Sequence, residues 1–115
     1  MKLSFVVTLL LAAAFAAHGQ QGMPRMTSVE PVSGKTGDVI VVTGENLQKD
    51  TVSKVYLTDG KNDIEVSVSE QTEKELKFKI PAKANGRLSL MILTAAKDPK
   101  DQKLIEQPVK VQVDQ

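Results

Sequence analysis

Apolar and polar residues alternate along most of this chain, and glycine, proline and asparagine break the alternation at short intervals. Residues 29–47 show the pattern clearly: a first stretch ends at Pro31, a glycine-containing turn follows, and a second stretch, residues 38–43, ends before Gly44. Successive side chains of a β-strand point to opposite faces, so the alternation predicts strands that each bury one face. With turns at the breakers, this segment is typical of the opening of a small β-sandwich.

The same pattern continues to the end of the chain. We predict strands at residues 26–31, 38–43, 53–58, 63–68, 74–80, 87–94 and 105–113. Turn residues separate them, and Asn85-Gly86 is the strongest signal in the chain for a tight hairpin turn. About seven short strands with regular turn signals indicate an all-β sandwich or barrel.

The N-terminal segment has the features of a secretion signal. Lys2 precedes an almost wholly apolar stretch, residues 3–17, which ends among small residues. A membrane span needs about 20 apolar residues, so this shorter stretch predicts a signal peptide over residues 1–19. We expect cleavage after Gly19, with cleavage after Ala16 and an uncleaved anchor as the alternatives. The mature protein is then periplasmic or extracellular and has no stable membrane span.

Composition limits the partners and the core of the mature chain. Removing residues 1–19 from the 115 leaves 96, near the common size of one domain. The removal of Lys2 leaves 14 Lys and Arg against 14 Asp and Glu. A neutral, mixed surface argues against nucleic-acid binding and against a polybasic membrane patch. Cysteine is absent, and Tyr56 and Phe78 are the aromatic residues that remain, so an aliphatic core must hold the domain.

Four groups of residues together carry a family resemblance. They are Val29-x-Pro31 followed by Gly34-x-x-Gly37, Ile40-x-Val42-x-Gly44-x-Asn46-Leu47, Val55-x-Leu57, and Phe78-x-Ile80-Pro81 followed by Gly86 and Leu88-x-Leu90-x-Ile92. With these residues the chain resembles the IPT/TIG domain over residues 24–113. The resemblance implies an immunoglobulin-like β-sandwich of the E-set type, as in plexins. It also implies a binding or spacer role at a cell surface; the DNA-contact role of such domains in transcription factors does not suit a secreted, neutral chain.

The sequence offers little for catalysis. The chain has no cysteine, and its single histidine, His18, lies in the predicted signal peptide. The usual nucleophile–base pairs therefore cannot form, and we expect neither an enzyme nor a cofactor. Residues 59–63, Asp-Gly-Lys-Asn-Asp, place calcium-type oxygen ligands in one turn. Because Lys61 would repel the ion, we expect an ordinary turn and no metal site.

Two predicted strands leave apolar side chains on an outer face. If Leu88, Leu90 and Ile92 face the core, then Arg87, Ser89, Met91 and Leu93 face outward. By the same argument, inward Val55 and Leu57 leave Lys54, Tyr56 and Thr58 outside. These strands are neighbours in an immunoglobulin-like sheet, so Tyr56, Met91 and Leu93 are predicted to form one binding patch. The alternative is that they are strand-forming residues partly covered by lysine stems, with no partner.

The sequence therefore predicts a secreted, non-catalytic interaction module. Its expected partner is an extracellular or cell-envelope protein, with self-association as one form of this. A polysaccharide-binding module is the first alternative, although Tyr56 is the one aromatic residue available outside the core for stacking on sugars. A passive structural component of a cell surface is the second.

Overall fold

The computed structural model describes residues 22–114, so the predicted signal peptide, residues 1–19, lies outside the described range. The described chain forms nine strands and one short 3₁₀ helix. They are β1 (Arg25–Glu30), β2 (Ser33–Gly34), β3 (Val39–Glu45), β4 (Val52–Thr58), β5 (Asp63–Glu65), β6 (Val68–Gln71), β7 (Glu75–Lys79), β8 (Gly86–Thr94), η1 (Pro99–Asp101) and β9 (Leu104–Val113). Within residues 22–114, no helix has the length and apolar character needed to cross a membrane.

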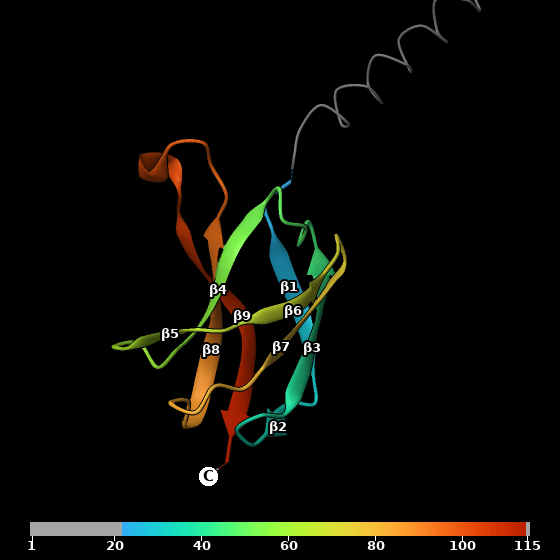
Figure 1. The fold of residues 1–115 in the computed structure, drawn as a ribbon, viewed down its shortest axis with the longest axis vertical. Coiled ribbons are helices and arrows are strands. Elements are labelled where there is room, and N and C mark those ends of the chain that lie inside the picture. The colour runs from blue at the N-terminus through green and yellow to red at the C-terminus, as the bar shows by residue number, and fades with distance from the viewer. Residues whose placement is uncertain (1–21, 115) are drawn as a thin grey trace, which may run out of the picture.

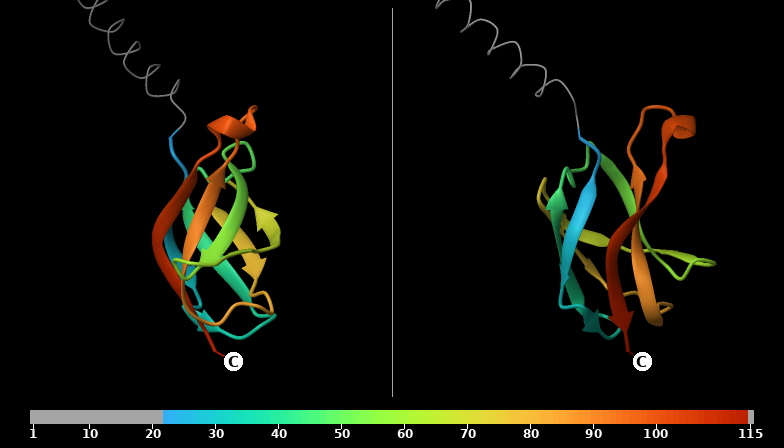
Figure 2. Two further views of the ribbon diagram at one scale, coloured as in Figure 1. Left: turned by 90° about the vertical axis from the view of Figure 1, so that its left-hand side faces the viewer. Right: turned by 180° about the vertical axis from the view of Figure 1, so that it is seen from behind.

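The strands form two sheets that face each other. One has the order β1-β3-β7-β6 and the other has the order β2-β9-β8-β4-β5. Figure 1 shows β4, β5, β8 and β9 of the five-stranded sheet on the left, the four-stranded sheet on the right and β2 at the bottom. The connection carrying η1 projects beyond the sandwich. The views in Figure 2 show the same two layers from the side and from behind. The predicted all-β, immunoglobulin-like sandwich is confirmed.

The core lies between the two sheets and is aliphatic apart from Phe78. Most of its fully buried side chains come from the inward positions of both sheets, as the alternating pattern predicts, and Leu47 and Ile80 follow the ends of β3 and β7. The largest are Phe78, Met26, Ile40, Leu47, Leu57, Leu76, Ile80, Leu90 and Ile92. No disulfide joins the sheets, because the chain contains no cysteine, so burial of this cluster supplies the main driving force for folding.

The predicted strand over residues 63–68 is wrong. Residues 63–65 form β5, which pairs with β4, whereas residues 68–71 form β6, which pairs with β7 in the opposite sheet. The chain changes sheets at Val66, which is buried and whose N–H donates to the carbonyl of Val55 (N···O 3.0 Å). Alternation continues through the crossing, so periodicity alone does not reveal that the strand is divided.

The hairpin predicted at Asn85-Gly86 is also wrong. Strand β7 lies in the four-stranded sheet and β8 in the five-stranded sheet, so residues 80–85 cross between layers. Gly86 has the positive φ (87°) that the Asn-Gly signal indicates. The left-handed conformation therefore occurs at the first residue of β8 and does not belong to a two-residue hairpin turn.

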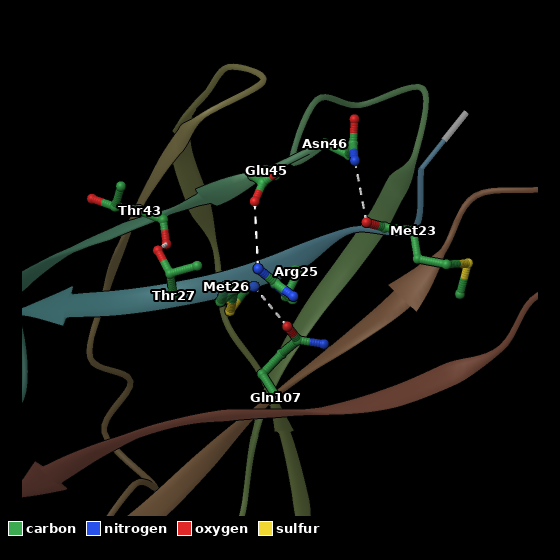
Figure 3. Close-up of polar contacts among 8 residues, drawn as sticks. All are labelled: Met23, Arg25, Met26, Thr27, Thr43, Glu45, Asn46 and Gln107. Carbon is green, nitrogen blue, oxygen red and sulfur yellow. Dashed lines mark hydrogen bonds and ion pairs between the residues drawn. The ribbon is translucent and has the colours of Figure 1, made fainter. Parts of the chain in front are cut away.

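One buried side chain connects the two sheets where β1 passes β9. The amide oxygen Oε1 of Gln107, on β9, accepts a hydrogen bond from the backbone N–H of Met26, on β1, at 2.7 Å (Figure 3). Gln107 is 4% exposed, and Nε2 of its amide donates to the carbonyl of Ile105 at 3.3 Å. Gln107 lies where the β8–β9 register shifts, between the Ser89 and Met91 pairs. The bulge thus places a polar side chain against a backbone donor that would otherwise be buried and unpaired.

An exposed ion pair and an exposed hydrogen bond also hold the same end of β1. Arg25 and Glu45 form an ion pair at 3.5 Å, and Nδ2 of Asn46 donates to the carbonyl of Met23 at 3.2 Å (Figure 3). Because these groups are accessible to water, we assign them a small share of stability beside Gln107.

Replacing Gln107 with leucine is expected to destabilise the domain by about 1–3 kcal/mol, because the N–H of Met26 remains buried without an acceptor. Gln112→Leu is the matched control, since Gln112 is exposed on the same strand. Denaturant unfolding of both variants measures the difference. Equal midpoints for the two variants would mean that the Gln107 hydrogen bond contributes nothing net.

Candidate functional site

The predicted patch residues lie together on the outer face of the five-stranded sheet. Tyr56 on β4 is directly opposite Met91 on β8, and Leu93 is opposite Lys54. Their inward neighbours Val55 and Leu57 are fully buried, so the outward positions follow from the alternation. Tyr56, Met91 and Leu93 are half-buried, and each keeps part of its side chain accessible.

A fourth apolar side chain, missed by the sequence analysis, extends this surface. Leu104, the first residue of β9, is directly opposite Leu93 and is 54% exposed. The predicted strand began one residue later, at 105, and so left Leu104 in the preceding loop. The signal was present, because Leu104 alternates with Glu106 on the outward side of the same strand. We refer to Tyr56, Met91, Leu93 and Leu104 as the apolar patch.

Charged side chains border the apolar patch on two sides. Glu65 on β5 is opposite Tyr56, and Glu106 on β9 is opposite Met91. Lys54 forms an ion pair with Glu65 at 3.7 Å, with about half of each side chain exposed. The arrangement is an apolar centre with a charged rim, which is the usual anatomy of a protein–protein contact surface.

Two residues expected to be accessible on this face are buried. Thr58 and Ser89 point outward by register, but they are 6% and 8% exposed. They are directly opposite each other on adjacent central strands, with Asp63 and Lys110 opposite their other sides. Small side chains between longer cross-strand neighbours lose access to water. The accessible part of the face is therefore narrower than the sequence predicted.

The turn at residues 59–62 uses its carboxylate for backbone hydrogen bonds. Oδ1 of Asp59 accepts from the N–H groups of Lys61 (2.8 Å) and Asn62 (2.7 Å), and Oγ1 of Thr58 accepts from the N–H of Gly60 (3.0 Å). This is the Asx-turn geometry of a β4–β5 hairpin. Residues 22–114 contain no group of three or more acidic, histidine or cysteine side chains that could hold a metal ion.

These hydrogen bonds give Asp59 a pH-dependent role. Backbone N–H groups, first that of Asn62 and then that of Lys61, hold the pKa of its carboxyl below the ordinary value. The ionised form therefore stabilises the folded state above the ordinary aspartate pKa, and this contribution is lost as pH falls through the lowered pKa. We expect the stability difference between wild type and Asp59→Asn to shrink across that acid range in denaturant unfolding. A difference independent of pH would contradict the assignment.

The sequence profile of the IPT/TIG domain matches residues 24–113, and the chain belongs to this family. No curated protein sequence matches the chain. The predicted family resemblance is confirmed, and with it the immunoglobulin-like sandwich.

Solved structures from Bacteroides share the fold. A Bacteroides thetaiotaomicron structural genomics protein of unknown function matches 82% of this chain with a TM-score of 0.65 and 21% identity. An auxiliary nutrient binding protein of Bacteroides ovatus matches 82% with a TM-score of 0.58 and 23% identity. SGBP-B of the B. ovatus mixed-linkage glucan utilization locus, solved with a mixed-linkage heptasaccharide, matches 82% with a TM-score of 0.55 and 13% identity.

This chain spans a small part of each of those proteins. It covers 22%, 21% and 24% of their lengths, respectively. The likeness therefore concerns one domain of each larger chain, and at these identities it concerns the fold.

Proposed function

We propose that this chain is a secreted, non-catalytic interaction module that binds an extracellular or cell-envelope protein through the apolar patch. The observation that carries the proposal is the direct cross-strand placement of Tyr56 beside Met91 and of Leu93 beside Leu104. Clustered apolar side chains on a flat sheet face favour contact with a partner, and tyrosine is enriched among the residues that dominate binding energy.

The N-terminal segment and the structural relatives support the proposed location. The apolar stretch at residues 3–17 is typical of a signal peptide. Two structural relatives are named as an auxiliary nutrient binding protein and as SGBP-B of a glucan utilization locus, and binding of nutrients or glycans suits a protein outside the cytoplasm. A periplasmic or extracellular site is part of the proposal.

A non-catalytic role fits the chemistry of the described residues. Residues 22–114 contain no histidine or cysteine, and their carboxylates do not gather into clusters of three. The resolved carboxylate contacts go to backbone amides and to lysine or arginine side chains, as at Asp59 and Glu65. These contacts serve turn geometry and surface charge pairing.

Polysaccharide binding is a second candidate function. The observation in its favour is the SGBP-B relative, whose structure holds a mixed-linkage heptasaccharide. Tyr56 is the aromatic residue on the outer sheet face and is half-buried, so stacking on sugar rings has one platform there.

Retention of a partner from host envelope extract tests the proposal. Immobilised residues 20–115 are compared with a Tyr56→Ser, Met91→Lys double variant and with Val41→Lys, a control on the outer side of the four-stranded sheet. We expect the double variant to lose more than tenfold in retention, because it removes a tyrosine anchor and buries a charge at the contact. We expect Val41→Lys to retain the partner as wild type does.

Every other outcome leaves the apolar patch unsupported as the surface that binds a protein. Equal loss in both variants would indicate a general effect on folding, and equal retention would place the site on another surface. A neutral polysaccharide retained in place of a protein, and lost in the double variant, would favour the second candidate. Failure of every form to retain anything would favour a passive structural role.

A further inference from the structure

A groove with a positive lining lies at the other end of the same sheet. Its volume is about 470 Å³, and it is lined by Val32, Ser33, Arg87, Pro108, Lys110 and Gln112. These residues come from β8, β9 and the short parallel strand β2 with the residue before it. The groove is separate from the apolar patch, since none of its lining residues belongs to that patch.

Two cations in this groove lie close enough to share one anion. Arg87 on β8 is directly opposite Gln112 on β9, and Lys110 lies two residues before Gln112. Arg87 and Lys110 are therefore diagonal cross-strand neighbours, about 7–8 Å apart at Cα. Side chains of their length can bring both charged groups to a single carboxylate.

The positive charges are not compensated within the described chain. Among residues 22–114, the ion pairs are Arg25–Glu45, Lys54–Glu65, Lys77–Glu70 and Lys100–Asp98, so neither groove cation is engaged. Their cross-strand neighbours are uncharged: Ser89 is opposite Lys110, and Gln112 lies between Arg87 and Ser33. A partner can therefore supply the counter-charge without breaking an existing pair.

The remaining lining defines the other features of a ligand. Ser33 and Gln112 also line the groove, and the side chain of each carries at least one hydrogen-bond donor. Val32, 65% exposed, and Pro108 add apolar surface beside them. The groove suits a small group that combines one carboxylate, several nearby acceptor oxygens and an apolar edge. A uronic acid unit presents all three within one ring, whereas an aspartate or glutamate side chain presents the carboxylate alone.

We infer that this groove binds uronate units of an acidic polysaccharide, with Arg87 and Lys110 holding the carboxylate and Ser33 and Gln112 holding ring or hydroxyl oxygens. Arginine matches a carboxylate through two parallel N–H donors, and the lysine adds a point charge. The inference goes beyond the proposed protein-binding function and does not depend on the apolar patch.

Affinity electrophoresis of residues 20–115 through gels containing polygalacturonate tests the inference. We expect retardation in these gels, none in gels of neutral mixed-linkage glucan, and weaker retardation at high salt. The Arg87→Gln, Lys110→Gln variant should lose at least tenfold in affinity, since it removes both charged donors to the carboxylate. A Lys74→Gln, Lys79→Gln variant is the matched control. It removes the same charge from exposed positions elsewhere, in the turn before β7 and at the end of β7.

The Tyr56→Ser variant separates this inference from the proposed function. It should bind polygalacturonate as wild type does, whatever its effect on a protein partner. Absence of retardation in the wild type would overturn the inference. An equal loss of affinity in the Arg87→Gln, Lys110→Gln variant and in the Lys74→Gln, Lys79→Gln control would also overturn it. Competition by polyglutamate as effective as that by soluble oligogalacturonate would also overturn it, because the groove would then recognise carboxylates without the sugar.

Discussion

Replacing Phe78 with alanine is expected to destabilise the domain by about 3–5 kcal/mol. Phe78 is fully buried in the centre of the four-stranded sheet, between Ile40 on β3 and Val68 on β6. Domains of this size are commonly stable by about 5–15 kcal/mol, so the variant should lose a large part of its free energy of unfolding. Thermal unfolding measures the effect, with about 4–8 °C expected for each kcal/mol.

Phe78→Leu is the control for this prediction. Leucine keeps most of the apolar volume, and it should cost less than about 2 kcal/mol. A loss as large as that of the alanine variant would mean that ring shape, rather than burial and cavity volume, determines the packing. A small loss for alanine would mean that the core collapses around the missing side chain.

Replacing Gly44 with alanine is the second large effect that we expect, at about 3 kcal/mol or more. A β-carbon at Gly44 would overlap the backbone carbonyl of Arg25 and would lie 2.9 Å from Cα of Met26. Both atoms belong to the neighbouring strand β1, which cannot move without disturbing the β1–β3 ladder. Denaturant unfolding of the variant gives the magnitude.

Gly60→Ala is the comparison for Gly44→Ala. Gly60 has φ +97° with no atom within 4 Å of a built β-carbon, so the cost there is conformational alone. It should be about 1–2 kcal/mol. If Gly60→Ala proved as damaging as Gly44→Ala, close approach of β1 would not be the reason for glycine at position 44.

Much of the fold could be predicted because burial in a sandwich imposes a period of two. The inward sets Val55 with Leu57, and Leu88 with Leu90 and Ile92, are buried as expected. The pairing of β4 with β8 is also as expected, so Tyr56 and Met91 are adjacent. Whether a side chain faces the core or the solvent depends on its position within its own strand, so the alternation in one sequence is enough to predict it.

The features that the sequence did not predict depend on tertiary context. The division of residues 63–68 into β5 and β6 is set by which sheet edge each half can pair with. The sequence alone does not distinguish Gln107 from an exposed polar residue. The bulge in β9 directs its side chain toward the N–H of Met26. The groove at Arg87 and Lys110 requires the β8–β9 register and the parallel pairing of β2, neither of which periodicity specifies.

The proposed binding face is tested most directly by site-specific photo-crosslinking in host envelope extract. A photoreactive amino acid replaces Leu104, which is 54% exposed in the apolar patch, or Val39, which is 43% exposed on the four-stranded sheet. The proposal predicts that the probe at 104 yields one dominant protein adduct, which is lost on adding the Tyr56→Ser, Met91→Lys changes. It predicts no such adduct from position 39. The same adduct from both positions, or one from position 39 alone, would contradict the assignment of the apolar patch as the binding surface.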